Sequence, residues 1–198
     1  MAGPSRSSHI QSSPRLQLVF IYARPDDTSD AGGTWRDQLL DYNASPGNNL
    51  GLLPAFELYE NDIYRALAKQ FGLGNPYILS AGWGLINAAF LTPAYDITFS
   101  PQAEKFVRQR KHDRFHDLSL IPGATREQVV CFASKEYVPL FAALTDTVRG
   151  ERIVFYNSVT QPSAPGCKLI RFETRGRTNW QYKCAAAFLS GRLVTDLA

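Results

Sequence analysis

The part of the sequence best suited to chemistry is residues 77–86, Tyr-Ile-Leu-Ser-Ala-Gly-Trp-Gly-Leu-Ile, together with Asp96 further on. An apolar, strand-like run leads directly into a Gly-Trp-Gly turn, and in α/β chains the loops after the strands form the ligand crevice. Glycines let backbone approach a ligand closely, and Trp83 offers a flat face. The pattern predicts a pocket for a planar ring such as a nucleobase. A buried turn with Trp83 in the core is the alternative.

Asp96 lies just past this turn, in the segment Tyr95-Asp-Ile-Thr-Phe99. A partly enclosed carboxylate can stabilise an oxocarbenium ion at a sugar carbon and orient a water molecule, which is the chemistry of N-glycosidic hydrolysis. Glu57 and Asn157 are the residues expected to help place that water. Glu57 also has a structural reason to be present, since a negative charge is favoured at a helix start. For Asp96 the alternative is a cap on its own loop.

Positive charge gathers in two segments, residues 108–114 and residues 171–183. The second segment interleaves with aromatic residues, and nucleic-acid grooves use arginines for phosphates and aromatics for stacking. Because the net charge is only +3, solvated faces of a mildly basic protein are the alternative interpretation. The residues expected to contact DNA are Arg108, Arg110, Lys111, Arg114, Arg171, Arg175, Arg177, Trp180 and Lys183.

Several enzyme and metal-binding classes are disfavoured. The sequence has no phosphate-binding glycine-rich loop, no dinucleotide fingerprint and no Gly-x-Ser-x-Gly elbow. His112 and His116 have the spacing of a helical metal pair, but no third ligand recurs, and their basic neighbours favour a solvated or phosphate-facing helix. The three cysteines match neither a disulfide framework nor a zinc site. We therefore expect neither a metal nor an organic cofactor.

The elements that must position these residues alternate between strand and helix patterns. A long connection rich in Asp, Gly, Asn and Pro is expected over residues 24–54. The alternation predicts an α/β fold with a mixed, mostly parallel sheet flanked by helices. Strands are expected at 16–22, 76–80, 128–133, 151–157 and 168–174, and helices at 56–71 with Gly72 as the cap, from Ser100 into 107–117, at 137–147 and at 180–189.

Length and composition indicate one globular domain. The chain has 198 residues, 44% of them hydrophobic, and no apolar run approaches the roughly 20 residues that span a bilayer. The first 14 residues are rich in Ser, Pro and Arg and lack the apolar segment of a secretory signal. We expect a disordered tail over 1–14, a single domain over 15–198, a cytoplasmic location, no membrane partner and a monomer.

The central motif also resembles a known family. Residues 77–86, followed by Pro93-Ala-Tyr-Asp-Ile-Thr98, are similar to the Leu-Ser-Ala-(Lys/Leu)-Tyr-Gly-Leu-Leu and Pro-Tyr-Asp-Leu pattern of the YaaA-like superfamily. Leu58-Tyr-Glu-Asn-Asp-Ile-Tyr-Arg-Ala66 resembles the Leu-Tyr-x-x-x-x-Phe-Arg helix that precedes this pattern. The resemblance covers roughly residues 55–100 and implies an α/β domain that handles DNA. It places Ser80, Gly82, Trp83, Gly84, Tyr95 and Asp96 in a shared pocket.

This chain departs from the family pattern in two places. Relatives carry a Cys-Ser-x-x-Lys-type sequence after the first strand, where this chain has Tyr22-Ala-Arg-Pro-Asp26, so Tyr22 is expected to line the base pocket. Trp83 stands where tyrosine is usual. Both changes bear on the substrate, and a larger or altered base is one interpretation.

The functional expectation is a DNA glycosylase. It would excise a modified, even bulky and hypermodified, base from phage DNA by hydrolysing the N-glycosidic bond, as the resemblance to base-excising relatives in anti-phage defence implies. One alternative is a DNA-binding stress protein without catalysis. The other is a base hydrolase or transferase that acts on free nucleosides or nucleotides.

Overall fold

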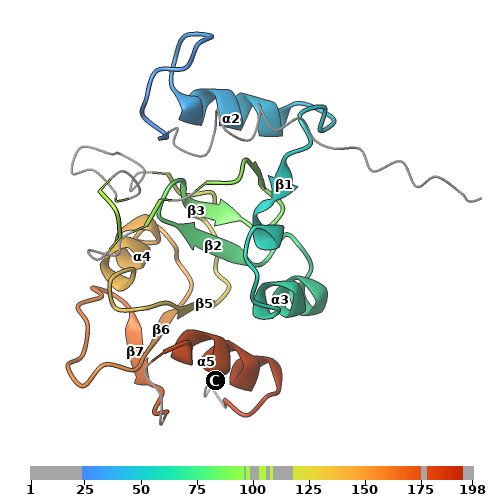
Figure 1. Cartoon of the computed structure of the whole chain (residues 1–198). Coiled ribbons are helices and arrows are strands. Elements are labelled where there is room, and N and C mark those ends of the chain that lie inside the picture. The colour runs from blue at the N-terminus through green and yellow to red at the C-terminus, as the bar shows by residue number, and fades with distance from the viewer. Residues whose placement is uncertain are drawn as a thin grey trace, which may run out of the picture.

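The computed structural model describes residues 24–95, 97–98, 103–105, 108, 118–174 and 178–193. The predicted tail, the strand predicted at 16–22 and most of the helix predicted from Ser100 lie outside these residues. The helices are α2 (Trp35–Ala44), α3 (Ile63–Phe71), α4 (Val138–Leu144) and α5 (Trp180–Leu189), with a 3-10 turn η1 (Ala55–Glu57) (Figure 1). The strands are β1 (Leu53–Pro54), β2 (Tyr77–Ser80), β3 (Gly84–Asn87), β4 (Leu91–Thr92), β5 (Val129–Phe132), β6 (Arg152–Tyr156) and β7 (Lys168–Arg171).

The predicted α/β class is confirmed. Strands β5, β6 and β7 form a parallel sheet in that order, with Val130 opposite Ile153 and Val154 opposite Leu169. Strands β2 and β3 form an antiparallel pair, as do β1 and β4. Within the described residues the strands therefore lie in three small sheets.

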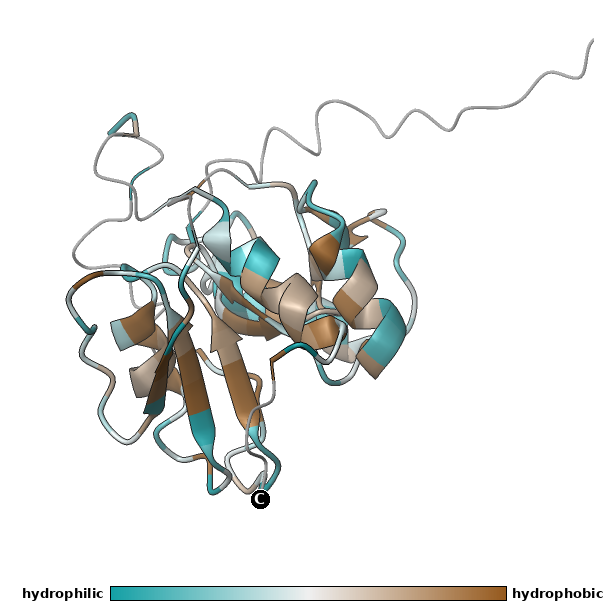
Figure 2. Ribbon diagram, turned by 90° about the horizontal axis from the view of Figure 1, so that it is seen from below, coloured by the Kyte–Doolittle hydropathy of each residue, from teal (hydrophilic) through white to brown (hydrophobic). Residues whose placement is uncertain are grey.

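Strand β6 is the centre of the parallel sheet and is buried on both faces. Ile153 and Phe155 pack with Trp180 and Cys184 of α5, whereas Val154, on the opposite face, packs with residues of α4. This division follows from the two-residue period of a strand. An apolar strand covered on both sides is typical of parallel sheets, and Figure 2 shows hydrophobic residues along these strands.

Most of the predicted elements are confirmed, but one helix is shorter than predicted, and helix α2 and strands β1, β3 and β4 were not predicted. Strands β2, β5, β6 and β7 and helices α4 and α5 lie within their predicted ranges. The predicted helix over 56–71 is shorter, because α3 begins at Ile63 after the separate turn η1. Asn61 marks this start, since its side-chain oxygen accepts from the Ile63 N–H at 3.0 Å. Gly72 ends the helix with a φ of 75°, as expected.

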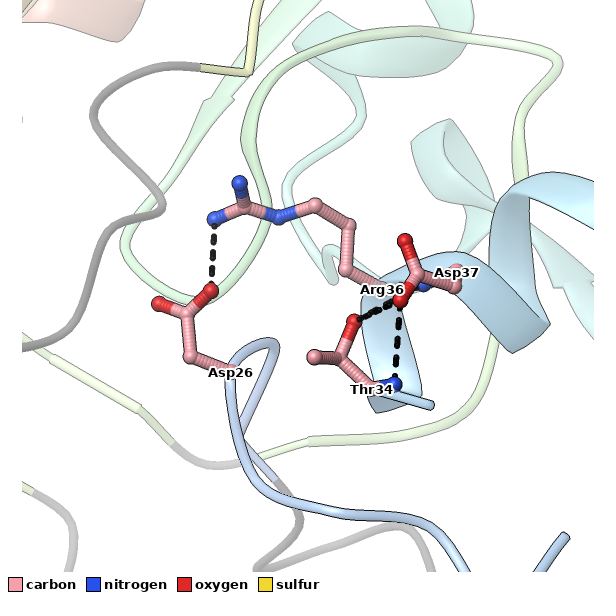
Figure 3. Close-up of polar contacts among 4 residues, drawn as sticks. All are labelled: Asp26, Thr34, Arg36 and Asp37. Atoms are coloured by element: carbon pink, nitrogen blue, oxygen red, sulfur yellow. Dashed lines mark hydrogen bonds and ion pairs between the residues drawn. The ribbon is translucent and has the colours of Figure 1, made fainter. Parts of the chain in front are cut away.

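The connection over 24–54 contains helix α2, which the sequence analysis missed. Thr34 and Asp37 form a capping box: the Thr34 hydroxyl accepts from the Asp37 N–H at 3.2 Å, and the Asp37 carboxylate accepts from the Thr34 N–H at 3.0 Å. Figure 3 shows this carboxylate also accepting from the Thr34 hydroxyl, beside the Arg36–Asp26 ion pair. The Thr-x-x-Asp spacing is a local helix-start signal, and it outweighs the turn-forming composition around it.

Thr34→Ala is expected to lower the free energy of unfolding by about 1 kcal/mol, because the N–H of Asp37 loses its acceptor. Thermal or urea unfolding of both proteins measures the change. Thr34→Ser keeps the hydroxyl and serves as the matched control. Equal losses in the two variants would contradict a capping role.

None of the helices within the described ranges is both long enough and apolar enough to cross a membrane.

Candidate functional site

Ser80 organises the turn between β2 and β3. Its side chain is fully buried, and its Oγ accepts from the N–H groups of Gly82 at 3.1 Å and Trp83 at 2.9 Å. The same oxygen lies 2.6 Å from the hydroxyl of Tyr95. A serine that accepts two amides while contacting a third polar group holds both the turn and the segment around Tyr95 in place.

A chain of hydroxyl groups runs from this turn to Tyr59. The Tyr95 hydroxyl lies 2.8 Å from that of Tyr59. The two amides occupy both lone pairs of Ser80 Oγ, so the Ser80 O–H must donate to Tyr95. In the bond between Tyr95 and Tyr59, either hydroxyl can be the donor. The chain therefore links the turn to two tyrosine hydroxyl groups, each of which can donate and accept hydrogen bonds.

The tyrosines of this region are neutral at physiological pH. Burial raises the pKa of Tyr95, although its hydrogen bonds with Ser80 and Tyr59 act in the opposite direction. Burial, and then the neighbouring Tyr95, raise the pKa of Tyr59 well above its usual value. Burial also raises the pKa of Tyr137 to about 12. These side chains can therefore form hydrogen bonds and stack, but they supply no phenolate base.

A pocket of about 190 Å³ opens beside the hydroxyl chain. An apolar cavity of roughly 150 Å³ can hold benzene, so this volume suits a single ring. Its lining combines residues that follow η1, β2, β4 and β5, namely Leu58, Tyr59, Ala81, Ala94, Tyr95, Ile97 and Tyr137. Asp96 lies outside the described residues, but Tyr95 and Ile97, its two chain neighbours, both line this pocket.

The glycines of the turn serve internal packing. A β-carbon on Gly82 would lie 3.2 Å from two ring carbons of Tyr95 and 3.3 Å from Cδ1 of Ile97. Gly84 has a φ of 83°, which side chains rarely adopt. From the sequence, both glycines are expected to let the backbone approach a ligand closely. The structure instead places the Tyr95 ring against Gly82 and gives Gly84 a conformational role.

The prediction that Trp83 forms a wall of the pocket is wrong. Its side chain is 1% exposed and belongs to an apolar cluster with Ile78, Ile86 and Phe90. It meets Tyr95 edge to face, with ring centroids 6.4 Å apart. The indole N–H has no hydrogen-bond partner among the described residues. The turn directs the indole into the core, which was the alternative kept open from the sequence.

Neither Glu57 nor Asn157 lines this pocket. Glu57 lies in η1 with an exposed side chain. Asn157 follows β6, and its amide donates to the Phe172 carbonyl at 2.6 Å, which ties together the loops after β6 and β7. These contacts do not support the predicted role of either residue in placing water, because Asn157 is engaged elsewhere and Glu57 faces solvent.

Only part of the predicted basic surface is described. Arg171, at the end of β7, is exposed and pairs with Glu173 at 3.2 Å, and Lys183 is exposed on α5. Arg108 is half-buried, and its Nε donates to the Ala103 carbonyl, so its guanidinium is partly committed within the fold. The remaining predicted contacts, Arg110, Lys111, Arg114, Arg175 and Arg177, lie outside the described residues, as does Tyr22 of the predicted base pocket.

Trp180 is not the stacking platform that was expected. It is 7% exposed and packs with Ile153, Phe155 and Cys184. It opens helix α5, and the first turn of that helix lies on the sheet. Within α5, Trp180 therefore packs in the core, whereas Lys183 is exposed.

Tyr59 and Tyr137 are pocket residues that the sequence analysis missed. Tyr59 falls within the helix predicted over 56–71, and Tyr137 is the first residue of the helix predicted over 137–147. A tyrosine among the apolar residues of a helix indicates a buried polar contact, because a buried hydroxyl needs a hydrogen-bond partner. It does not identify the partner, since Tyr95 is 36 residues from Tyr59.

Comparison of the chain with protein-family models, with curated proteins and with solved structures finds no match in any of the three.

Proposed function

We propose that this chain is a DNA glycosylase that releases a modified base by hydrolysing its N-glycosidic bond. The observation that carries the proposal is the ring-sized pocket lined by Tyr59, Tyr95 and Tyr137, which both chain neighbours of Asp96 border. The resemblance of residues 77–98 to the pattern of the YaaA-like superfamily, some members of which excise bases, supports the same reaction.

The pocket suits a base that has left the DNA stack. Extruding a base from a duplex costs a few kcal/mol, and stacking and edge hydrogen bonds offset that cost. The tyrosine rings provide apolar faces, and the hydroxyl groups of the Ser80–Tyr95–Tyr59 chain provide hydrogen-bonding groups for the edge of a base. Because these groups are neutral, they recognise shape and hydrogen-bonding pattern rather than charge.

Asp96 supplies the carboxylate in this proposal. As the bond between C1′ and the base nitrogen breaks, positive charge develops on the sugar, and a carboxylate beside it stabilises that charge. The carboxylate then takes a proton from a water molecule whose oxygen bonds to C1′. The departing base takes its proton from solvent. This reaction requires neither a metal nor an organic cofactor.

The basic segment from residue 171 onward is the proposed phosphate contact. The carboxyl ends of parallel strands meet at the same edge of a sheet. Arg171 ends β7, and Tyr137 of the pocket follows β5 in the same parallel sheet. The exposed guanidinium of Arg171 is therefore at the edge that carries a wall of the pocket.

Asp96→Asn is expected to lower the rate of base release by at least about 100-fold, because the amide carries no charge and accepts no proton. The assay incubates the protein with phage DNA that contains modified bases and with unmodified DNA, and then measures abasic sites and released base. Glu57→Gln, at an exposed carboxylate outside the pocket, is the matched control and is expected to retain wild-type rates.

Two results would reject the proposal. If the wild-type protein binds DNA but releases no base from any modified substrate, a binding protein without catalysis is favoured. If Asp96→Asn and the wild-type protein release base equally fast, the carboxylate is not part of the mechanism. Release from free nucleosides but not from DNA would favour the nucleoside hydrolase alternative.

A further inference from the structure

A large apolar groove separates β2 from the parallel sheet. Its volume is about 750 Å³, and its lining includes Ile78 and Leu79 of β2 and Val130 and Phe132 of β5. Helices α3 and α5 contribute Leu67 and Phe188. Protein interiors are close-packed, with few voids larger than a water molecule. A groove of this size and lining therefore calls for an occupant.

The strands on its two sides have free edges in the described part of the chain. There, β2 pairs with β3 alone and β5 pairs with β6 alone. Strand β5 has the apolar composition of a central strand, but Val129, Val130 and Phe132 are only partly buried. In β6, which has a strand on each side, three consecutive residues are at most 1% exposed. The composition of β5 thus fits a strand with a second neighbour.

We propose that residues 16–22 of this chain fill the groove as a parallel strand between β2 and β5. Their sequence, Leu-Gln-Leu-Val-Phe-Ile-Tyr, is a nearly continuous apolar run of the kind found in strands covered on both faces. Seven residues in extended conformation span roughly 23 Å. A strand of seven residues is longer than β2 and β5, which flank the groove and have four residues each.

The described chain just after this segment fixes its direction. Arg24 donates to the Arg108 carbonyl at 2.6 Å, and Arg108 forms a bridge with Thr98. Thr98 adjoins Ile97, which packs against Gly82 beyond the carboxyl end of β2. Arg24, two residues after segment 16–22, is therefore tied to the chain that packs beyond the carboxyl end of β2.

The same end of the groove also carries the carboxyl end of β5. Tyr137, which follows β5, meets Ala81, which follows β2, in the ring-sized pocket. Strands β2 and β5 therefore run in the same direction, and a strand between them is parallel to both. The result is a single sheet in the order β3, β2, residues 16–22, β5, β6, β7. Tyr22 would end beside the pocket.

Hydrogen–deuterium exchange on the full-length wild-type protein tests this placement directly. We expect the amides of residues 17–22 to exchange on the order of 1,000-fold more slowly than an unstructured chain, as ladder amides of a core strand do. The amides of residues 2–10 are the internal reference. Exchange of 17–22 at the rate of that reference would overturn the proposal.

The molecular mass in solution shows whether the strand in the groove comes from the same chain or from a second copy of it. Protection of 17–22 in a monomer supports the proposal. Protection that appears only in a dimer and is lost on dilution would overturn it, because the strand would then come from another molecule.

Val19→Pro tests the hydrogen bonding of the proposed strand, because proline lacks the N–H that a central strand donates to its neighbour. It is expected to lower the midpoint of thermal unfolding by roughly 5–10 °C or to prevent folding, whereas Ser8→Pro should leave the midpoint unchanged. Equal midpoints for the two variants would count against the proposal. If Val19→Pro does not fold, the exchange measurement on the wild-type protein still decides.

Discussion

Trp83→Ala is expected to lower the free energy of unfolding by about 3–5 kcal/mol, the usual loss when a large aromatic side chain is removed from a core. The indole is 1% exposed and packs with Ile78, Ile86 and Phe90. For a chain of this size the loss corresponds to a decrease of roughly 10 °C in the unfolding midpoint. The change acts on stability because the indole does not line the ring-sized pocket.

Two further variants sharpen this test. Trp83→Phe keeps an aromatic ring and removes the indole N–H that has no partner among the described residues, so it should retain most of the stability. Val159→Ala, at a side chain that is 82% exposed, should change stability by less than about 0.5 kcal/mol. Urea unfolding of the purified variants gives the values. Wild-type stability of Trp83→Ala combined with a loss of base release would instead place the indole in the pocket.

Ser80→Ala is expected to lower the free energy of unfolding by about 3 kcal/mol. The substitution removes the acceptor of the Gly82 and Trp83 amides and the partner of the Tyr95 hydroxyl, all in a buried setting. Each hydrogen bond contributes about 1 kcal/mol net, and buried groups left without partners add to the loss. Ser80 is thus expected to act by holding the turn and the pocket wall.

Tyr95→Phe is the matched comparison, because it removes one hydroxyl and leaves the two amide bonds to Ser80 in place. We expect it to lose about 2 kcal/mol, because the Tyr95 hydroxyl is hydrogen-bonded to both Ser80 and Tyr59. Urea unfolding measures both variants under the same conditions. A Ser80→Ala protein as stable as Tyr95→Phe would show that the amide bonds contribute little, and the turn would then need another explanation.

Elements with strong local signals could be predicted from the sequence. Helix α5 lies over 180–189 as predicted, and β6 lies within the apolar run 151–157. Both are short apolar runs bounded by polar or turn-forming residues, and such a run is a property of neighbouring residues. Helix α2 was missed although its Thr34–Asp37 capping box is also local, because the surrounding Gly, Asn and Pro were weighted more heavily than the cap.

The candidate site could be predicted only in part. Ser80 and Tyr95 belong to a motif that is short in sequence, and both lie in the hydroxyl chain. Tyr59 and Tyr137 come from other segments, and their contribution depends on how those segments pack. Trp83 illustrates the same limit. An aromatic residue between two glycines can face a ligand or the core, and the local sequence does not distinguish these two orientations.

The sequence by itself determined the α/β class, most of the helices and strands, and the turn at which Ser80 accepts two amides, since each depends on residues a few positions apart. Only the tertiary structure decided that the indole of Trp83 is buried and that three tyrosines from distant segments line one pocket. Burial of a side chain and convergence of hydroxyl groups depend on long-range packing. The local pattern of residues leaves that packing undetermined.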